Sequence, residues 1–490
     1  MAQDPRTPVL VGVGAVTQRE ADPVRAQEPL ELMSAALERA AEDAGSRALL
    51  ARADSVRAAR GFWNYPDPCR LLATRFGASR TRTEIAEIGV LQTTLLGRAA
   101  ADIAAGRAEV VLVVGAEARH RAQRARAAGI AAPLTQQAPV TPDSVLRPHA
   151  PIVSEREVRA GLQLPVAQYA MVENALRAAE GLSLEAHRRE IASLWAVFSR
   201  VAAGNSDAWS PAPVSAETIA DPLQNPMLAF PYGKLHCSHW NVDQAAGLVF
   251  CSVATARALG IPRARWIFPL AVADANHMLA LSERRDLHRC AGFARAAERA
   301  FERAGRSLSD VAHRELYSCF PAAVRVQLRE IGIHDERPPS VTGGMTFAGG
   351  PLNHFVFQAL VRMASVLRDA PGSSGLVTAV SGMLTKQGVS LWSSEPGGAA
   401  FAHDDVSEAT ARETPAVELA PAAESRATIA TYTVLYEGPA PKRALLLCDL
   451  EGGKRALVAS DDAAFALRAT REEACGRAVR IKADGGVDWL

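Results

Sequence analysis

The sequence lacks the features that mark several classes of protein. Its 54 basic and 53 acidic side chains nearly balance, so no charge excess indicates binding to nucleic acid. No apolar run is long enough to span a bilayer. The N-terminus also lacks the charged segment and the long apolar segment of a signal peptide. We therefore expect a cytoplasmic chain without a membrane span.

Cysteine and aromatic residues are also scarce. The seven cysteines are scattered and contain no CxxC pair, which argues against a disulfide framework and a zinc knuckle and favours reduced thiols. His236 and His239 flank Cys237, but no further ligand cluster is visible in the sequence, and we predict no metal site. Aromatic residues make up only 6% of the chain, so the cores must be mainly aliphatic. A chain of 490 residues should form two or three compact units.

A self-similarity is the most informative positive signal. Residues 36–45 (ALERAAEDAG) and 296–305 (AAERAFERAG) match at seven of ten positions, with apolar residues at helical spacing and a terminal glycine. After each copy we expect a strand, a glycine-bearing loop, a second helix (95–106 and 355–367) and a buried strand (110–114 and 375–380). This shared β-α-β-α-β order predicts duplicated α/β units with parallel sheets.

Three regions fall outside the duplication. Residues 120–235 are too long for a passive connection and read as an inserted loop domain, which either builds substrate walls or is decoration. Residues 396–427 are rich in Ala, Pro, Glu and Ser and read as a linker. Over 428–490, short strands predict a small all-β barrel. The first of these strands alternates at Tyr432, Val434 and Tyr436.

Three segments then carry a resemblance to the thiolase superfamily. AAGRAEVVLVVGAEA (104–118) resembles the strand after the nucleophile helix, NVDQAAGLVFCS (241–252) the NDGAA segment, and GGMTFAGGP (343–351) the GGAxAxGHP signature. With the predicted barrel, the chain most resembles type 1 thiolase-like proteins, near the sterol-carrier-protein thiolases. The resemblance implies a duplicated five-layer αβαβα fold with halves at 1–255 and 256–395, followed by an OB-like barrel.

The residues at the expected catalytic positions are altered. The resemblance places the cysteine nucleophile on or beside Gly89, and no cysteine lies close enough in the sequence to replace it. Gly350 stands where the histidine of GHP is expected, although His354 follows four residues later. Thr378 stands where the cysteine of the CxG motif is expected, and a threonine does not titrate usefully near neutral pH. Orthodox thiolase chemistry is therefore not expected.

The fourth motif, YSCF (317–320), resembles the HDCF box of the sterol-carrier-protein branch. It puts Tyr317 where an asparagine or histidine orients a catalytic water, and it keeps Cys319. A phenol can donate to a thioester oxygen, or act as a base if its pKa is lowered. Alternatively, both residues belong to the core at a strand end. We predict Tyr317, Cys319 and His354 as catalytic residues, and as substrate-binding residues Gly89, Gln92, Gly343, Gly344, Gly350 and Thr378.

The resemblance implies an acyl-CoA ligand and a role in lipid metabolism, with no cofactor beyond the coenzyme A of the substrate. One hypothesis is an aldolase-like enzyme that uses Tyr317 as acid or base and amides around Gly89 or Gly350 as donors. Thiolase-like aldolases work with an OB-fold partner, which the C-terminal region resembles. The alternatives are a non-catalytic acyl-CoA-binding or scaffold protein, and an acetyl-CoA acetyltransferase that uses Cys319. A homodimer through the sheet that holds 110–114 is open, since the barrel could block that contact.

Overall fold

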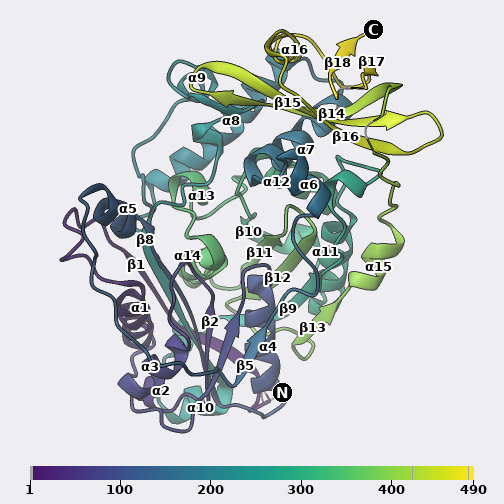
Figure 1. Cartoon of the computed structure of the whole chain (residues 1–490). Coiled ribbons are helices and arrows are strands. Elements are labelled where there is room, and N and C mark those ends of the chain that lie inside the picture. The colour runs from purple at the N-terminus through teal and green to yellow at the C-terminus, as the bar shows by residue number, and fades with distance from the viewer. Residues whose placement is uncertain (1–3, 422, 484) are drawn as a thin grey trace.

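Three β-sheets organise the chain, whose computed structural model describes residues 4–421, 423–483 and 485–490 (Figure 1). The N-terminal sheet contains, in spatial order, β1 (Pro8–Thr17), β8 (Asp243–Ser252), β4 (Val110–Ala118), β2 (Ser55–Ala59), β3 (Arg82–Ala86) and β5 (Ser144–Leu146). The C-terminal sheet contains β10 (Val311–Glu315), β11 (Ser374–Ser381), β12 (Lys386–Ser393), β9 (Phe268–Ala275) and β13 (Ala402–Asp405). The third sheet contains β16 (Arg455–Ser460), β15 (Ala440–Leu450), β14 (Ser425–Glu437), β17 (Ala478–Ile481) and β18 (Val487–Trp489), with β6 (Met227–Ala229) and β7 (Tyr232–Gly233) beside β14.

The two large sheets repeat one strand order, which agrees with the predicted duplication. The order β2-β4-β8-β1 in the N-terminal sheet returns as β10-β11-β12-β9 in the C-terminal sheet. In both sheets the first pair is parallel and the next two pairs are antiparallel. The prediction of parallel sheets is therefore wrong in part, because β8 and β12 each return antiparallel between their two neighbours.

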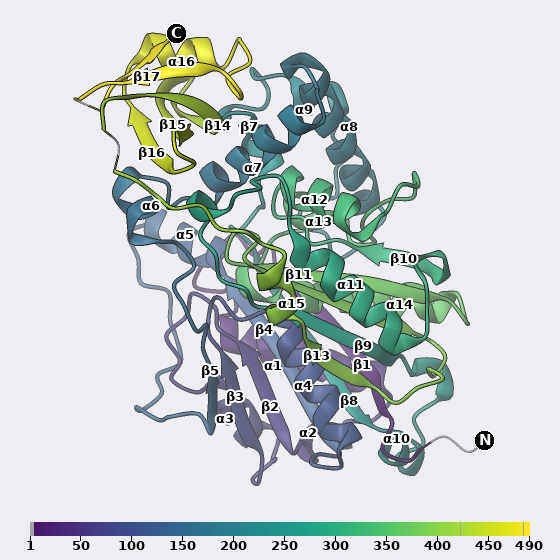
Figure 2. The same ribbon diagram turned by 90° about the vertical axis from the view of Figure 1, so that its right-hand side faces the viewer.

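Helices cover the outer faces of these sheets and fill the space between them (Figure 2). On the outer face of the N-terminal sheet lie α1 (Pro29–Asp43) and α3 (Pro68–Arg75), and on that of the C-terminal sheet lies α11 (Ala291–Ala304), with α12 (Pro321–Ile331) beside it. Between the sheets lie α4 (Gln92–Ala104) and α14 (Phe355–Asp369), each in contact with strands of both. This is the predicted five-layer arrangement, and the two self-similar segments fall on the matching helices α1 and α11.

Glycines in β1 allow α1 to lie directly on the sheet. A Cβ atom built at Gly12 would lie 2.0 Å from the carbonyl oxygen of Ala40, and one built at Gly14 would lie 2.3 Å from that of Ala36. A side chain at either position would push the helix away from the strand. The PVLVGVG sequence of β1 thus supplies apolar side chains to the core and leaves room for the backbone of α1.

The region 120–235, predicted as a loop domain, contains mostly helices. They are α5 (Arg119–Ala127), α6 (Glu155–Ala160), α7 (Pro165–Ala179), α8 (Leu184–Ala203) and α9 (Ala216–Ala220). A buried ionic group joins this region to the C-terminal half, because the carboxylate of Glu173 on α7 lies 2.9 Å from Nε2 of His187 on α8 and also pairs with Arg325 on α12. The ionic group and the hydrogen bond from the Tyr232 hydroxyl hold the pKa of Glu173 down to about 2 despite its burial.

The C-terminal region is mainly β-structure, as predicted, and its strands pair antiparallel, with α16 (Ala463–Ala469) packed on β15. The pairing of its described strands runs from β16 to β18 without joining these two ends, so the predicted barrel does not close. Strands β6 and β7 of the loop region extend the same sheet, and Figure 1 shows it next to α7, α8 and α9. The segment 396–427, predicted as a linker, contains β13 of the C-terminal sheet and α15 (Ser407–Arg412).

The remaining helices are short: α2 (Ala48–Ala51), α10 (Val253–Ala258) and α13 (Gly344–Phe347). Within the described part of the chain, no helix combines the length and apolar character needed to cross a membrane.

A buried carboxylate fixes the first turn of α4 against the C-terminal sheet. The hydroxyls of Thr93 and Thr94 donate to the two oxygens of Asp274 on β9 at 2.6 and 2.8 Å. Nε2 of His403 on β13 lies 3.0 Å from the same carboxylate. Burial lowers the pKa of His403, but the hydrogen bond and charge of Asp274 outweigh it, and the pKa is raised overall. Asp274 therefore holds α4, β9 and β13 together.

We expect Asp274→Asn to lower the free energy of unfolding by about 3–5 kcal/mol near pH 6, because it breaks a buried ion pair. The part of this loss that comes from the ion pair with His403 should disappear as the pH rises through the raised pKa of His403. A histidine with a raised pKa stabilises the fold only while it is protonated. Urea denaturation at about pH 6 and pH 9 measures both effects, with Asp369→Asn at the exposed end of α14 as the control. An equal loss at both pH values would contradict an ionised His403.

Candidate functional site

The start of α4 meets the start of α14 at one end of the space between the sheets. Oε1 of Gln92 accepts a hydrogen bond of 2.6 Å from the backbone N–H of Val356. The Gln92 side chain also hydrogen-bonds the hydroxyl of Tyr317. Gln92 is only 4% exposed. Two predicted site residues, Gln92 and Tyr317, are therefore in direct contact.

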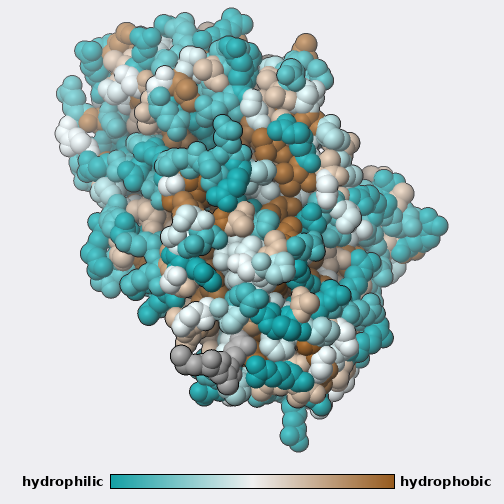
Figure 3. Space-filling view, turned by 180° about the vertical axis from the view of Figure 1, so that it is seen from behind, coloured by the Kyte–Doolittle hydropathy of each residue, from teal (hydrophilic) through white to brown (hydrophobic). Residues whose placement is uncertain are grey.

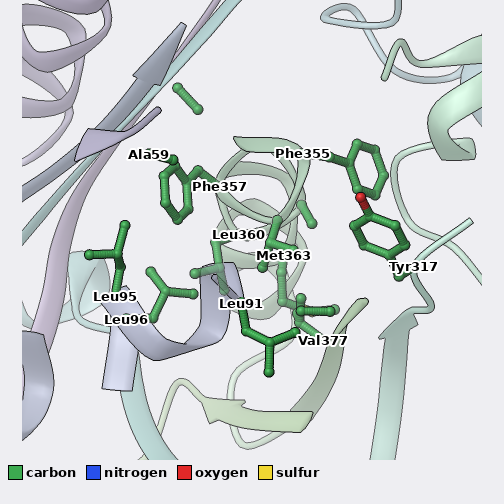
Figure 4. Close-up of a cluster of buried hydrophobic side chains, with 14 of the residues drawn as sticks. Ala59, Leu91, Leu95, Leu96, Tyr317, Phe355, Phe357, Leu360, Met363 and Val377 are labelled. Atoms are coloured by element: carbon green, nitrogen blue, oxygen red, sulfur yellow. The ribbon is translucent and has the colours of Figure 1, made fainter. Parts of the chain in front are cut away.

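Tyr317 follows β10 and is held on several sides. Its backbone N–H donates to Oγ1 of Thr378 at 2.8 Å, and its carbonyl accepts from Nε2 of Gln327 at 2.8 Å. Its ring lies edge-on to that of Phe355, with centroids 5.8 Å apart, at the side of a cluster of apolar residues between α4 and α14 (Figure 4). Burial raises the pKa of the phenol well above its usual value. The structure thus opposes Tyr317 as a base and favours it as a hydrogen-bond donor.

Cys319 is buried close to Tyr317 and Tyr169. Burial raises the pKa of its thiol to about 12, and the hydrogen bond with Tyr169 only partly opposes this effect. Because the thiolate is the nucleophilic form, the geometry disfavours a covalent role for Cys319 at neutral pH. The ring of Tyr169 stacks on Phe320 at 4.7 Å, so the YSCF motif is enclosed by α7 of the loop region.

His354 points away from Tyr317, toward the N-terminal sheet. It ends the 3₁₀ turn Leu352–His354, and a Cβ atom built at Gly115 of β4 would lie 2.3 Å from its Cβ. Burial lowers its pKa to about 3, so the imidazole is neutral. Its neighbour Phe355 makes the contact with Tyr317 instead. In this arrangement His354 packs against β4.

The glycine pair of the GGMTFAGGP segment packs against α8. Gly343 and Gly344 have φ of 96° and 71°, which favours glycine. Cβ atoms built there would lie 2.4 Å from Ala202 and 2.5 Å from Phe198. Helix α8 thus fills the space above this turn.

Gly350 is enclosed in the same way. A Cβ atom built on it would lie 2.0 Å from Oγ of Ser238, and its N–H already donates to the carbonyl of His239 at 2.9 Å. This amide therefore does not serve as a free donor to a substrate oxygen. The backbone N–H of Ser238 donates to the carbonyl of Cys319 at 3.0 Å, which ties the Gly350 loop to the YSCF motif.

Thr378 lies within β11 and not in the loop that follows. Its hydroxyl accepts from Tyr317 N–H and contacts Oε1 of Gln327, which is a structural role. The loop between β11 and β12 contains Met383 and Leu384 with φ of 53° and 62°. With Leu352, they are the non-glycine residues of positive φ in the described part of the chain, so backbone strain gathers in two loops of the C-terminal half.

Lys386, which the sequence analysis missed, lies beside Gly89, the position at which the resemblance expects a nucleophile. It opens β12, is 1% exposed, and donates from Nζ to the carbonyl of Gly89. Desolvation lowers its pKa to about 8, and it has no ion pair within the described residues. A lysine that enters the buried KQGVSLWS strand was the available signal in the sequence. It is the buried group at this site best suited to proton transfer near neutral pH.

The segment 147–153 covers this end of the site. Gly89 has φ of 105°, and a Cβ atom built on it would lie 3.0 Å from Pro148 and 3.2 Å from Ile152. Ile152 also lies 3.4 Å from a Cβ atom built at Gly382, in the loop before Lys386. The Gly89 turn, the YSCF motif, the GGMTFAGGP segment and Thr378 thus lie together. Other protein atoms occupy the space over the glycines among them.

Comparison with known proteins agrees with this geometry. The additional C-terminal domain of type 1 thiolase-like proteins matches residues 405–486. The crystal structure of a monomeric SCP2-thiolase-like protein type 1 from Mycobacterium smegmatis is 29% identical, with a TM-score of 0.84 over 100% of both chains. The chain thus shares the thiolase fold and the additional C-terminal domain of type 1 thiolase-like proteins. A search of curated protein sequences finds no match.

More distant structures share the thiolase-like core alone. The Ltp2-ChsH2(DUF35) aldolase is 19% identical with a TM-score of 0.60, over 80% of this chain and 99% of that chain. The dimeric peroxisomal thiolase of Saccharomyces cerevisiae is 15% identical with a TM-score of 0.59, over the same shares. At these identities the likeness concerns the fold. The dimer considered from the sequence remains a prediction, since the more similar Mycobacterium smegmatis protein is monomeric.

We expect Lys386→Met to raise the free energy of unfolding near pH 7 by about 1–3 kcal/mol, because it removes a buried unpaired cation. In the unmodified protein, the free energy of unfolding should rise as the pH increases from about 8, the pKa of Lys386 in the folded state, to its ordinary value of 10.5. In this range the unfolded chain binds more protons than the folded chain. Chemical denaturation at about pH 7 and pH 10 tests both expectations, with exposed Lys442→Met as the control. A variant that is less stable at both pH values would show that the bond to Gly89 outweighs the desolvation.

Proposed function

We propose that the protein binds acyl-CoA thioesters and cleaves or forms a carbon–carbon bond without a cysteine nucleophile. The observation that carries this proposal is that a protonated Tyr317 and a buried Lys386 lie against the two ends of one short turn, Tyr317 at Gln92 and Lys386 at Gly89. One is a hydrogen-bond donor and the other titrates near neutral pH, as an acid–base pair requires. A structural neighbour with the same fold is an aldolase, which supports this reaction class.

The reaction we propose is a retro-aldol cleavage of a 3-hydroxyacyl-CoA. The neutral amine of Lys386 accepts the proton of the 3-hydroxyl group, the bond between C2 and C3 breaks, and C3 leaves as a carbonyl product. The electron pair moves into the thioester carbonyl, and Tyr317 stabilises the enolate oxygen by a hydrogen bond. The Lys386 ammonium then protonates C2, which yields the shorter acyl-CoA and restores the amine.

Roles are thus divided differently from the sequence prediction. Tyr317 was predicted as acid or base, but burial raises its pKa and leaves only the donor role near neutral pH. Lys386 takes the base role because desolvation brings its pKa to about 8. The segment 147–153 lies over Gly89, so entry of a substrate requires this segment to move.

A non-catalytic acyl-CoA-binding or scaffold role is the second candidate. It is favoured by the apolar side chains that fill the space between α4 and α14, among them Leu91, Phe357 and Met363 (Figure 4). An acetyl-CoA acetyltransferase is less well supported, because the pKa of about 12 keeps the Cys319 thiol protonated.

Incubation with 3-hydroxyacyl-CoA, 3-ketoacyl-CoA and acetyl-CoA, followed by mass spectrometry, separates these functions. We expect cleavage of the 3-hydroxyacyl-CoA, with a rate that rises with pH through about 8 as Lys386 loses its proton. Lys386→Met should lower this rate by about 10²–10⁴-fold. Tyr317→Phe should lower it by about 10²–10³-fold with little change in CoA binding.

Matched controls are Lys442→Met, which removes an exposed lysine, and Tyr65→Phe, which removes a buried hydroxyl bonded to Glu28 outside the site. Binding without turnover of any of the three thioesters would support the scaffold role. Acetyl transfer that disappears in Cys319→Ala would support the acetyltransferase instead.

A further inference from the structure

A cavity lies between the loop region and the additional C-terminal domain, and none of its lining residues belongs to the YSCF motif. Its volume is about 820 Å³, within the range of small-molecule pockets. Helices α8 and α9 and the β6–β7 turn form one side, and the β14–β15 turn and the end of α16 form the other. Hydrophobic side chains gather in recesses on the face of the molecule shown in Figure 3, with hydrophilic residues around them.

The two sides of the cavity are firmly joined. Strand β6 pairs with β14 through Ala229 and Leu435, and the N–H of Phe230 donates to the carbonyl of Val434 at 2.8 Å. The ring of Phe230 also stacks on Tyr432, with centroids 6.0 Å apart. One continuous sheet therefore joins the two walls of the cavity.

The floor of the cavity is uncharged, and among its polar side chains one atom, Nε2 of His236, has no partner within the described residues. Of the residues there, Asn225 donates to the carbonyl of Ile219 at 2.7 Å and accepts from Leu235 N–H at 2.6 Å. Nδ1 of His236 accepts from Gly233 N–H at 3.1 Å, whereas its Nε2 is buried without a hydrogen-bond partner. Burial lowers the pKa of His236 to about 4, so the floor carries no charge. The inner part of a ligand should therefore be uncharged and largely hydrocarbon, since apart from His236 Nε2 the floor leaves no polar atom to pair with.

The mouth of the cavity differs from the floor in charge. Arg188 and Arg471 are exposed there, together with Leu223, which is 92% exposed. Arg188 already pairs with Glu185, whereas Arg471 has no carboxylate partner within the described residues. One unpaired guanidinium matches a single negative charge better than the several charges of a coenzyme A nucleotide.

We propose that this cavity binds a free long-chain carboxylate, with its hydrocarbon chain inside and its carboxylate on Arg471. The site is separate from the proposed acyl-CoA chemistry, and it uses a wall that the additional C-terminal domain supplies. Such a ligand would join the additional domain to the loop region and stabilise their contact.

The probe for this site is cis-parinarate, an 18-carbon fluorescent carboxylate, compared with its methyl ester. We expect saturable binding of cis-parinarate to the full chain. Arg471→Met should weaken it by about tenfold or more, since a charge-assisted hydrogen bond is lost. The same substitution should leave binding of the methyl ester unchanged. Arg480→Met, at an exposed position of β17, is the matched control and should affect neither probe.

A second variant tests the hydrocarbon part without touching the charge. Ala220→Trp, at the last residue of α9, should block binding of both probes by filling the cavity. Ala127→Trp, at the exposed last residue of α5, should bind as the unmodified protein does. Equal weakening of acid and ester by Arg471→Met would overturn the carboxylate assignment. Binding unaffected by Ala220→Trp, or no binding at all, would overturn the site.

Discussion

The packing of α4 and α14 between two sheets is the constraint on which the rest of the structure depends. Both helices contact strands on two sides, so small residues must make room for their neighbours. A Cβ atom at Gly97 would lie 2.6 Å from the His403 ring, and one at Gly375 would lie 2.4 Å from Met363. Because the two helices begin at the same end of the molecule, the loops before them meet there. The contact between Gln92 and Val356 joins residues 264 positions apart in the sequence.

This meeting of loops explains how a thiolase-like site can change its chemistry and keep its architecture. Where the resemblance expects two cysteines and a histidine, the chain has Gly89, Thr378 and Gly350, and Pro148 and Ser238 take the space over the two glycines. What remains is a buried phenol and a buried amine whose pKa values burial moves in opposite directions. The additional domain shares a sheet with the loop region and lines a cavity there.

Hydrophobic periodicity and the internal repeat predicted most of the fold. The ALERAAEDAG and AAERAFERAG segments identified matching helices, and the VVLVV run identified the buried strand β4. The sequence could not show that β8 and β12 run antiparallel, because strand direction depends on the connections and not on the pattern within a strand. It also could not show that the third sheet stays open, since β6 and β7 join it from a distant part of the chain. At the site, motif positions located Tyr317 but not its burial by Phe355 and Gln92, and Lys386 resembled an ordinary strand residue.

The central claim is that the acyl end of a CoA thioester binds where the motifs converge, beside Tyr317 and Lys386. Photolabelling with an acyl-CoA that carries a diazirine at the acyl terminus, followed by peptide mapping, tests it most directly. The account predicts labels within 86–92, 317–320 and 382–386, and their loss when unlabelled acyl-CoA competes. Labels confined to 184–236 and 436–471, around the cavity beside the additional domain, would contradict it.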